Sequence, residues 1–227
     1  MGGWLTCCSY KVFKAGSIEF ESTQIREPAQ INRVVYFDRI PLLIQLFPET
    51  LMERPDNPVG AFSPTPYSEA ARLEMTKVLA DSPGKLRELV SGLTESELET
   101  IYKNWTIRQI VHHLADSQVT AFIRMKLALT ERVPIVKPYS EGAWIELADT
   151  KTSPIEPSLQ MLEGVHSRWV CLINSLTEVD LQRTYFHPEH GKVFDLWTTI
   201  CIYAWHSQHH MGQIKWLRDF VIEKAVE

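Results

Sequence analysis

The sequence has little of several features that mark specialised classes of protein. Its 227 residues carry a net charge of −5, whereas a nucleic-acid-binding domain normally shows a basic surface. No stretch reaches the roughly 18 apolar residues that suggest a membrane-spanning helix. The first residues also lack the basic and apolar regions of a secretory signal. We therefore expect a protein that binds no nucleic acid and has no segment within a membrane.

Cysteine is scarce as well, and its positions suggest no site. Of the four cysteines, Cys7 and Cys8 are adjacent, which matches no zinc-ligand spacing, and Cys171 and Cys201 fall within apolar helical patterns. Glycine-rich phosphate loops, GxSxG nucleophile elbows and CxxC pairs are absent from the sequence. Incidental free thiols fit a reducing compartment, so we expect a cytoplasmic location.

Residues 1–50 differ in pattern from the rest of the chain. They contain many β-branched and aromatic residues, but no helical or alternating period persists. Four prolines between positions 52 and 70 then exclude a helix over that stretch, which resembles an arm or linker. We expect a poorly ordered N-terminal extension at 1–50 and one domain at 51–227. Met52 is a second candidate for the start of translation.

Four long apolar-periodic segments follow the prolines, at about 68–93, 106–130, 158–176 and 196–221. Pro83 is expected to kink or interrupt the first. A minor helix is expected at 141–149, and a hairpin-like loop with Gly191 at its turn before the last helix. We expect the longer connections between the first and second and between the third and fourth helices. The pattern predicts an all-α fold, a four-helix bundle.

Capping signals are recognisable at two places, in the short turn TESELE after the first long segment and at the start of the second. Thr94 and Glu97 have the spacing of a capping box, in which side chain and backbone groups satisfy each other at the start of a helix. Thr106 and Gln109 have the same spacing at the start of the second long segment. The second long helix is therefore expected to begin at Thr106.

Three of the eight histidines lie within five positions, in the segment WHSQHHMGQI. His206 and His210 are four residues apart and share one helix face, where two imidazoles can bind one divalent ion. His209 lies about 100° around the helix and should miss that ion. Such a pair is weak evidence alone, because most HxxxH pairs are exposed or hydrogen-bonded.

A further histidine is expected to point into the bundle from the second helix. In WTIRQIVHHLADS, His113 belongs to the core-facing stripe, while His112 is displaced to its side. Alone, His113 would be interpreted as a core histidine bonded to a backbone carbonyl. Together with His206 and His210 it supplies three nitrogen ligands and leaves positions open. That is the pattern of a catalytic metal site and not of a closed structural one.

The motifs WTxRQxVxHLADS and YxWHSxHH resemble those of the DinB-like superfamily, specifically its YfiT-like branch of proteins described as metal-dependent hydrolases. The likeness extends from about Asn57 to Leu217. It implies a four-helix bundle, often a homodimer, with His113, His206 and His210 as metal ligands. Bacillithiol S-transferases are among the related proteins. The chain departs from the pattern in reading YKNW where a glycine-rich turn usually precedes the tryptophan, so the loop beside the site should be shorter.

Three classes of function remain open. We prefer a metal-dependent enzyme, either a hydrolase or a thiol S-transferase, in which one ion per chain activates water or a small-molecule thiol. Zinc or nickel is the expected metal, with manganese or iron as alternatives. A non-catalytic metal-binding or stress-response protein would need a closed site, and no fourth protein ligand is evident. A structural bundle whose histidines bind nothing is the third possibility.

The remaining residues of the site are less clearly marked. No carboxylate stands out as a general base, since Asp116 is one residue off the face of His113 and is expected to be solvated or to pair within its helix. Further candidates are expected at the mouth of the pocket, although a structural role explains each of them at least as well: Tyr139, Trp144, Arg168 and His187.

Overall fold

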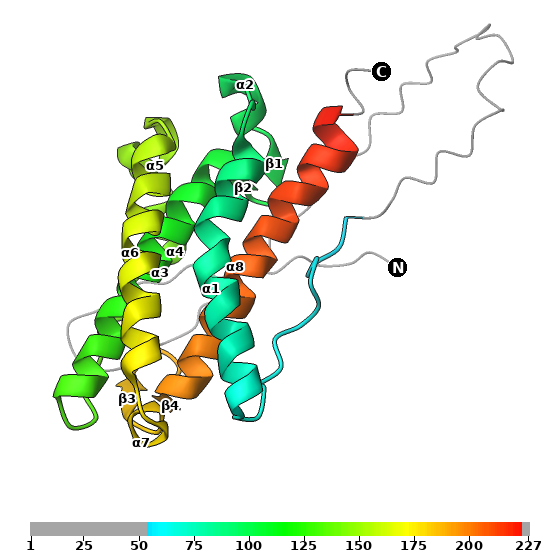
Figure 1. Cartoon of the computed structure of the whole chain (residues 1–227). Coiled ribbons are helices and arrows are strands. Elements are labelled where there is room, and N and C mark those ends of the chain that lie inside the picture. Colours follow the sequence, from blue (N-terminus) through cyan, green and yellow to red (C-terminus); the bar gives the residue numbers. More distant parts are fainter. Residues whose placement is uncertain (1–53, 224–227) are drawn as a thin grey trace, which may run out of the picture. The chain divides into compact units, whose positions relative to one another are not determined.

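The computed structural model describes residues 54–223, so the predicted extension at 1–50 lies outside it. Four long helices form a bundle, which confirms the predicted fold (Figure 1). They are α1 (Glu69–Val90), α3 (Ile107–Thr130), α6 (Glu156–Ser175) and α8 (Leu196–Leu217). Within the described range, no helix is both long and apolar enough to span a membrane.

The four helices do not pack in chain order. α1 and α3 each pack against both α6 and α8, so the consecutive helices α1 and α3 are diagonal to each other. α3 and α6 run in the same direction, and residues 131–155 return along the bundle between them (Figure 1). This is the longest connection. We had expected the longer connections between the first and second and between the third and fourth long helices. That expectation was wrong, because two neighbouring parallel helices, here α3 and α6, require a crossover connection.

Short elements fill the connections. Between α1 and α3 lie α2 (Glu95–Leu98) and a hairpin of β1 (Ile101–Tyr102) and β2 (Trp105–Thr106), which was not predicted. The crossover contains α4 (Glu141–Trp144) and α5 (Ala148–Thr152), two short helices where one was predicted. Before α8 come α7 (Glu178–Leu181) and the predicted hairpin, β3 (Thr184–His187) and β4 (Lys192–Asp195). A π-helical turn, η1 (Arg218–Ile222), ends the series where α8 was expected to continue.

The hairpin turns depend on backbone in the left-handed region. Gly191, at the turn between β3 and β4, has φ of 61°, which glycine adopts without steric penalty. Lys103 has φ of 57° in the tight turn between β1 and β2. That turn contains the YKNW sequence, with Lys103 and Asn104 between the paired Tyr102 and Trp105.

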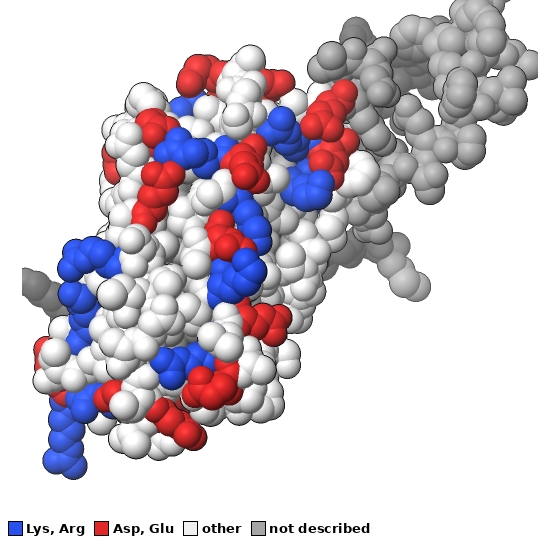
Figure 2. Space-filling model, in the orientation of Figure 1, with Lys and Arg blue, Asp and Glu red and all other residues white. Residues whose placement is uncertain are grey.

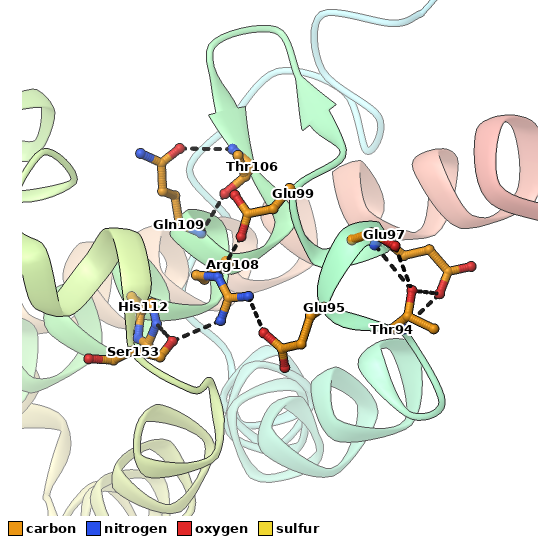
Figure 3. Close-up of polar contacts among 10 residues, drawn as sticks. Thr94, Glu95, Glu97, Glu99, Thr106, Arg108, Gln109, His112 and Ser153 are labelled. Carbon is orange, nitrogen blue, oxygen red and sulfur yellow. Dashed lines mark hydrogen bonds and ion pairs between the residues drawn. The ribbon is translucent and has the colours of Figure 1, made fainter.

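The N-terminus of α3 is fixed by a polar network (Figure 3). Both predicted capping boxes are present, at Thr94 with Glu97 and at Thr106 with Gln109. Arg108 is buried and pairs with Glu95 of α2 and with Glu99, while also donating to the carbonyl of Ser153. Through these contacts, the connection before α3 and the end of the crossover are both attached to the helix that carries His113.

Pro83 does not interrupt α1, contrary to prediction, and the helix runs unbroken from Glu69 to Val90. A proline inside a helix removes the N–H that would donate to the carbonyl four residues earlier, here that of Leu79. That carbonyl instead accepts a hydrogen bond from Nδ1 of the buried His166 on α6, at 2.6 Å. Because the lost donor is replaced from a neighbouring helix, α1 tolerates its proline.

The proline-rich segment before α1 packs on the bundle and is therefore more than a linker. Trp197 and Trp205 of α8 donate their indole N–H groups to the carbonyls of Thr65 and Gly60, at 2.7 and 3.0 Å. Pro58 lies so near α8 that a Cβ at Gly212 would be only 2.9 Å from the Cβ of Pro58. The absence of a side chain at position 212 allows this close approach.

The interior consists of two apolar clusters with a polar layer between them. One cluster contains the C-terminal half of α3 and the N-terminal half of α8, and the other contains the opposite halves of these helices. Buried polar side chains of α3 and α8 lie at the junction of the two, where Gln118 donates to Ser207 at 2.8 Å. The predicted metal ligands belong to this layer.

Charges of both signs are mixed on the face shown in Figure 2. Arg87 of α1 pairs with Glu156 and Glu163 of α6, at 2.8 and 2.7 Å. Asp81 lies between Lys77 and Lys85 along α1. These exposed pairs fix little of the fold energetically, because surface ion pairs contribute about 0–1 kcal/mol each.

Candidate metal centre

The three predicted histidines meet in the polar layer. Nε2 of His206 lies 3.2 Å from Nε2 of His113 and 3.2 Å from Nε2 of His210. His113 comes from α3 and the other two from α8. The sequence separation of 93 residues between His113 and His206 is thus closed by packing of α8 on α3.

The spacing of these nitrogens suits a single ion. Nitrogens bound at about 2.0–2.1 Å in tetrahedral geometry around one zinc ion lie roughly 3.3 Å apart, and the ring nitrogens here are separated by almost that distance. His113, His206 and His210 form a group whose ligand atoms are mutually close enough for one metal ion. A fourth donor from the described residues is not part of that group, so the arrangement is open.

Burial keeps these imidazoles in the form that binds metal. It lowers the pKa of His113 to about 4. Burial, followed by the neighbouring His113, lowers the pKa of His210 to about 3, and the pKa of His206 also lies well below its usual range. All three rings are therefore neutral near pH 7, and a metal ligand must be a neutral imidazole.

A neighbour one turn along α8 fixes the ring of His210. Nδ1 of His210 donates to Oε1 of Gln213 at 2.8 Å, which leaves the lone pair of Nε2 directed into the histidine group. The amide of Gln213 in turn donates to Nε2 of His209, at 3.0 Å. His209 lies outside the group, as its helical phase predicted, but it contacts the site through Gln213.

Trp105 forms one wall of the centre. Its ring stacks on that of His210 with centroids 5.9 Å apart and an angle of 10°, and lies 4.6 Å from the ring of His113. The tight β1–β2 turn brings it there. The sequence marked this tryptophan as part of a motif but gave no signal of its contact with the histidines.

A cavity of about 610 Å³ opens beside the centre. It is bounded by α3, the start of the crossover, the β3–β4 turn and α8, and His206 contributes to its wall. Its other polar walls include Arg124, Tyr139, Glu141, His187 and Tyr203. The cavity therefore provides a path by which a small molecule can reach the histidines.

The other sequence-predicted residues divide into two sets. Tyr139 and His187 line the cavity, as expected for the pocket mouth. Trp144 stacks on Tyr139 with centroids 4.4 Å apart, and the exposed Arg168 lies over the ring of Phe122. Neither of these two lines the cavity, so the structural explanation holds for both.

Asp116 is not the solvated acid that was expected. Its side chain is half-buried, and no salt bridge involves it among residues 54–223. Burial, with a smaller contribution from the charge of Asp149, raises its pKa to about 6. His112, displaced from the site as predicted, is bound to Ser158 and to the carbonyl of Ser153, at 2.7 and 3.3 Å.

The β3–β4 turn carries a second group of side chains, of which the sequence had indicated only His187. Ligand atoms of His187, Glu189 and His190 all lie within 4.8 Å of one another. Glu189 and His190 are exposed, and the rings of His187 and His190 stack with centroids 4.4 Å apart. Glu189 and His190 therefore form the outer rim of the cavity, and His187 belongs to its buried wall.

Comparison with known proteins identifies the family. Residues 79–214 match the DinB superfamily. "Putative metal-dependent hydrolase YfiT" of Bacillus subtilis is 40% identical over 160 residues, which are 69% of this chain and 90% of the relative. A protein of Bacillus cereus (strain 03BB102), also named "Putative metal-dependent hydrolase", is 43% identical over 164 residues, 71% of this chain and 94% of the relative.

A solved structure agrees with these sequence matches. It is described as "YfiT from Bacillus subtilis is a probable metal-dependent hydrolase with an unusual four-helix bundle topology". It is 37% identical to this chain and superposes with a TM-score of 0.70, covering 74% of this chain and 97% of that structure. Motifs, helix arrangement and matched length thus agree, and the chain belongs to the DinB superfamily, among its YfiT-like members.

Proposed function

We propose that this chain is a metal-dependent hydrolase whose His113, His206 and His210 bind one divalent ion. The observation that carries the proposal is the convergence of three neutral imidazoles beside an open cavity, with Nε2 of His206 at 3.2 Å from Nε2 of each of the other two. The names of the YfiT-like relatives support the same class of reaction. Zinc or nickel is the expected metal, and a cytoplasmic homodimer, which the family resemblance suggests, is the expected form.

An ion held by three imidazoles keeps its positive charge, and such an ion lowers the pKa of a bound water and polarises an oxygen of the substrate. The protein's own residues set the geometry around it. Gln213 holds the ring of His210, and Trp105 covers the side formed by His210 and His113. A small molecule in the cavity therefore approaches on the side of His206.

His187 is our candidate for moving the proton. It lines the same cavity as His206, is only 5% exposed, and its Nδ1 has no hydrogen-bond partner among the described residues. Burial, followed by the charges of Arg124 and His190, lowers the pKa of His187, so its ring is neutral and able to accept a proton near pH 7.

Metal content and turnover test the proposal together. Purified protein, stripped of metal and reconstituted separately with zinc, nickel, manganese or iron, is assayed for bound metal and for hydrolysis of a panel of esters and amides. We expect about one equivalent per chain with the native metal, and hydrolysis that requires it. Less than half an equivalent with all four metals contradicts the metal site.

The same preparations distinguish the other functions. Conjugation of small thiols to chlorinated electrophiles, without hydrolysis, would replace the hydrolase by a thiol S-transferase, because the same open site can activate a thiol. Full metal occupancy without either reaction would favour the non-catalytic metal-binding protein.

A further inference from the structure

Arg124 of α3 is a buried cation that forms no salt bridge with a carboxylate of the described residues. Its residue is 7% exposed, and it donates to the hydroxyl of Tyr203 at 3.3 Å and to the carbonyl of Lys137 at 3.1 Å. Its Nε is buried without a partner, and no salt bridge joins it to a carboxylate within residues 54–223. Burying an uncompensated charge is costly, so such a residue usually awaits a ligand or a partner.

Another arginine of the same helix shows the contrast. Arg108 is buried to a similar degree, at 4% exposure, but it pairs with the carboxylates of Glu95 and Glu99 (Figure 3). Arg108 therefore has a complete structural role. Arg124 has two neutral acceptors and an unused N–H, which leaves its charge available.

The space in front of Arg124 is the cavity of about 610 Å³ beside the metal centre. Other walls of this cavity also carry buried polar atoms, among them Nδ1 of His187, which has no hydrogen-bond partner in the described part of the chain, and the hydroxyl of Tyr139, which lies beside Ser117. The guanidinium and the hydroxyl can both donate a hydrogen bond. A cavity with donors around one cation is complementary to an anionic oxygen group.

The acidic residues of the cavity lie at its rim. Glu141 and Glu189 are exposed, whereas Arg124 is buried. Loss of solvation, followed by the charge of Glu189, raises the pKa of Glu141, and the more distant charge of Arg124 only partly opposes this rise. The sign of the charge therefore changes from negative at the rim to positive at the inner wall.

We propose that the substrate carries a carboxylate and that Arg124 binds it, with the hydroxyl of Tyr139 as a second donor. A planar guanidinium matches a planar carboxylate with two parallel hydrogen bonds. Because His206 lines the same cavity, a substrate held at Arg124 extends toward the histidine group. This inference rests on the proposed function, since it names the substrate class of the same site.

Binding of malonate to metal-free protein tests the proposal without involving the metal. Metal is removed with a nitrogen-donor chelator, so that no carboxylate is introduced, and affinity is measured by titration calorimetry at fixed ionic strength. Malonamide, which has a similar shape but no charge, is the control ligand. We expect malonate to bind and malonamide to bind at least about tenfold more weakly, because hydrogen bonds to charged groups are the stronger ones.

Two matched variants locate the site. Arg124→Gln and Arg168→Gln each remove one positive charge, the first from the cavity wall and the second from the exposed surface of α6. Arg124→Gln should weaken malonate binding by about tenfold to a hundredfold, the range expected for loss of a charged hydrogen bond, and Arg168→Gln should leave it unchanged. Equal affinity in both variants would overturn the proposal.

Further variants keep the test decisive if Arg124→Gln does not fold. Tyr139→Phe removes only the hydroxyl beside Ser117 on the cavity wall and should weaken malonate binding severalfold. Glu141→Gln removes a negative charge from the rim and should tighten it. Unchanged affinity in both contradicts the proposal. Because every measurement is made without metal, failure here is distinguishable from failure of the hydrolase assignment.

Discussion

The ring of His210 is held by Gln213, and this contact determines how well the histidine group is prepared for metal. Gln213→Leu removes the acceptor of the Nδ1 hydrogen bond and should weaken metal binding by about 10- to 100-fold, as loss of such supporting contacts does in other metal sites. Competition with a chromophoric chelator measures the affinity. Gln208→Leu, at a position of α8 outside this hydrogen bond, is the control. Equal affinity of both variants would show that Gln213 has no orienting role.

Neighbouring histidines should differ sharply in their effect on metal content. Alanine at position 113, 206 or 210 should abolish tight binding, because each change removes one of the converging nitrogens. His112→Ala should retain the metal, since its ring is bound to Ser158. His209→Ala should retain it with at most a modest loss, through Gln213.

Metal stoichiometry measured on the five alanine variants, with circular dichroism to confirm folding, checks this prediction. If His209→Ala lost the ion and His210→Ala kept it, the helical phase on which the site rests would be wrong. Comparable partial losses in all five would indicate a loose surface chelator.

Replacing His187 should lower the rate of turnover without changing metal binding at the three-histidine centre. Replacement by glutamine removes the titrating ring and should lower kcat by about 10²- to 10⁴-fold, the usual contribution of a general acid or base. Occupancy of the three-histidine centre should stay at that of the unmodified protein, because His187 is not among its converging histidines. Turnover and elemental analysis on the same sample separate the two effects. An unchanged kcat would remove His187 from the reaction.

Sequence periodicity was sufficient to place the three histidines together, but not their surroundings. The period of a helix fixes which residues share a face, and so assigns His113, His206 and His210 inward positions. The roles of Trp105 and Arg124 depend on where the β1–β2 turn and the crossover lie in space. Those segments have no periodic pattern, and nothing in the sequence indicates which side chains they bring together.

At the scale of a single element, α1 shows how one helix can depend on another. His166→Leu removes the donor to the Leu79 carbonyl, and leaving a buried carbonyl unpaired costs about 1–3 kcal/mol. In a Pro83→Ala background the new backbone N–H can donate to the same carbonyl. The His166→Leu change should therefore cost less in that background than in the original protein.

Urea unfolding of the two single variants and the double variant measures this coupling. A cost of His166→Leu that is the same in both backgrounds would show that the imidazole does not replace the proline's missing donor. His166→Asn, which keeps a donor at an equivalent position, serves as the control and should be the milder change.

The starts of helices were more predictable than their interruptions, because a cap depends on residues close together in the sequence. Capping by Thr94 or Thr106 involves residues three positions apart, which the sequence displays directly. The effect of Pro83 depends on His166, 83 positions later in the chain and on another helix. The prediction of a kink followed from local rules and was wrong because a tertiary contact overrides them.

For the whole molecule, residues 1–50 and the proline-rich segment that follows them should differ in their contribution to stability. Deleting residues 1–50 should leave the fold and metal content intact, because the helical bundle begins after them. Deleting residues 1–66 should lower the free energy of unfolding by roughly 2–4 kcal/mol, through lost hydrogen bonds to Trp197 and Trp205 and the lost burial of Phe62.

Thermal and urea unfolding of both truncated proteins, with metal analysis, checks this pair. Insolubility or loss of a cooperative transition after the shorter deletion would show that residues 1–50 contribute to the core. Equal stability of the two truncated proteins would show that the packing of residues 54–66 on α8 contributes nothing.

The 93-residue separation between His113 and His206 also orders events during synthesis. A ribosome releases His113 long before His206 and His210, so the early chain has one ligand and no site. At the proposed site, no ion can be captured until α8 has emerged and packed on α3. Metal loading would therefore be a late step, and a chain that had acquired an ion there would already have brought its last long helix into place.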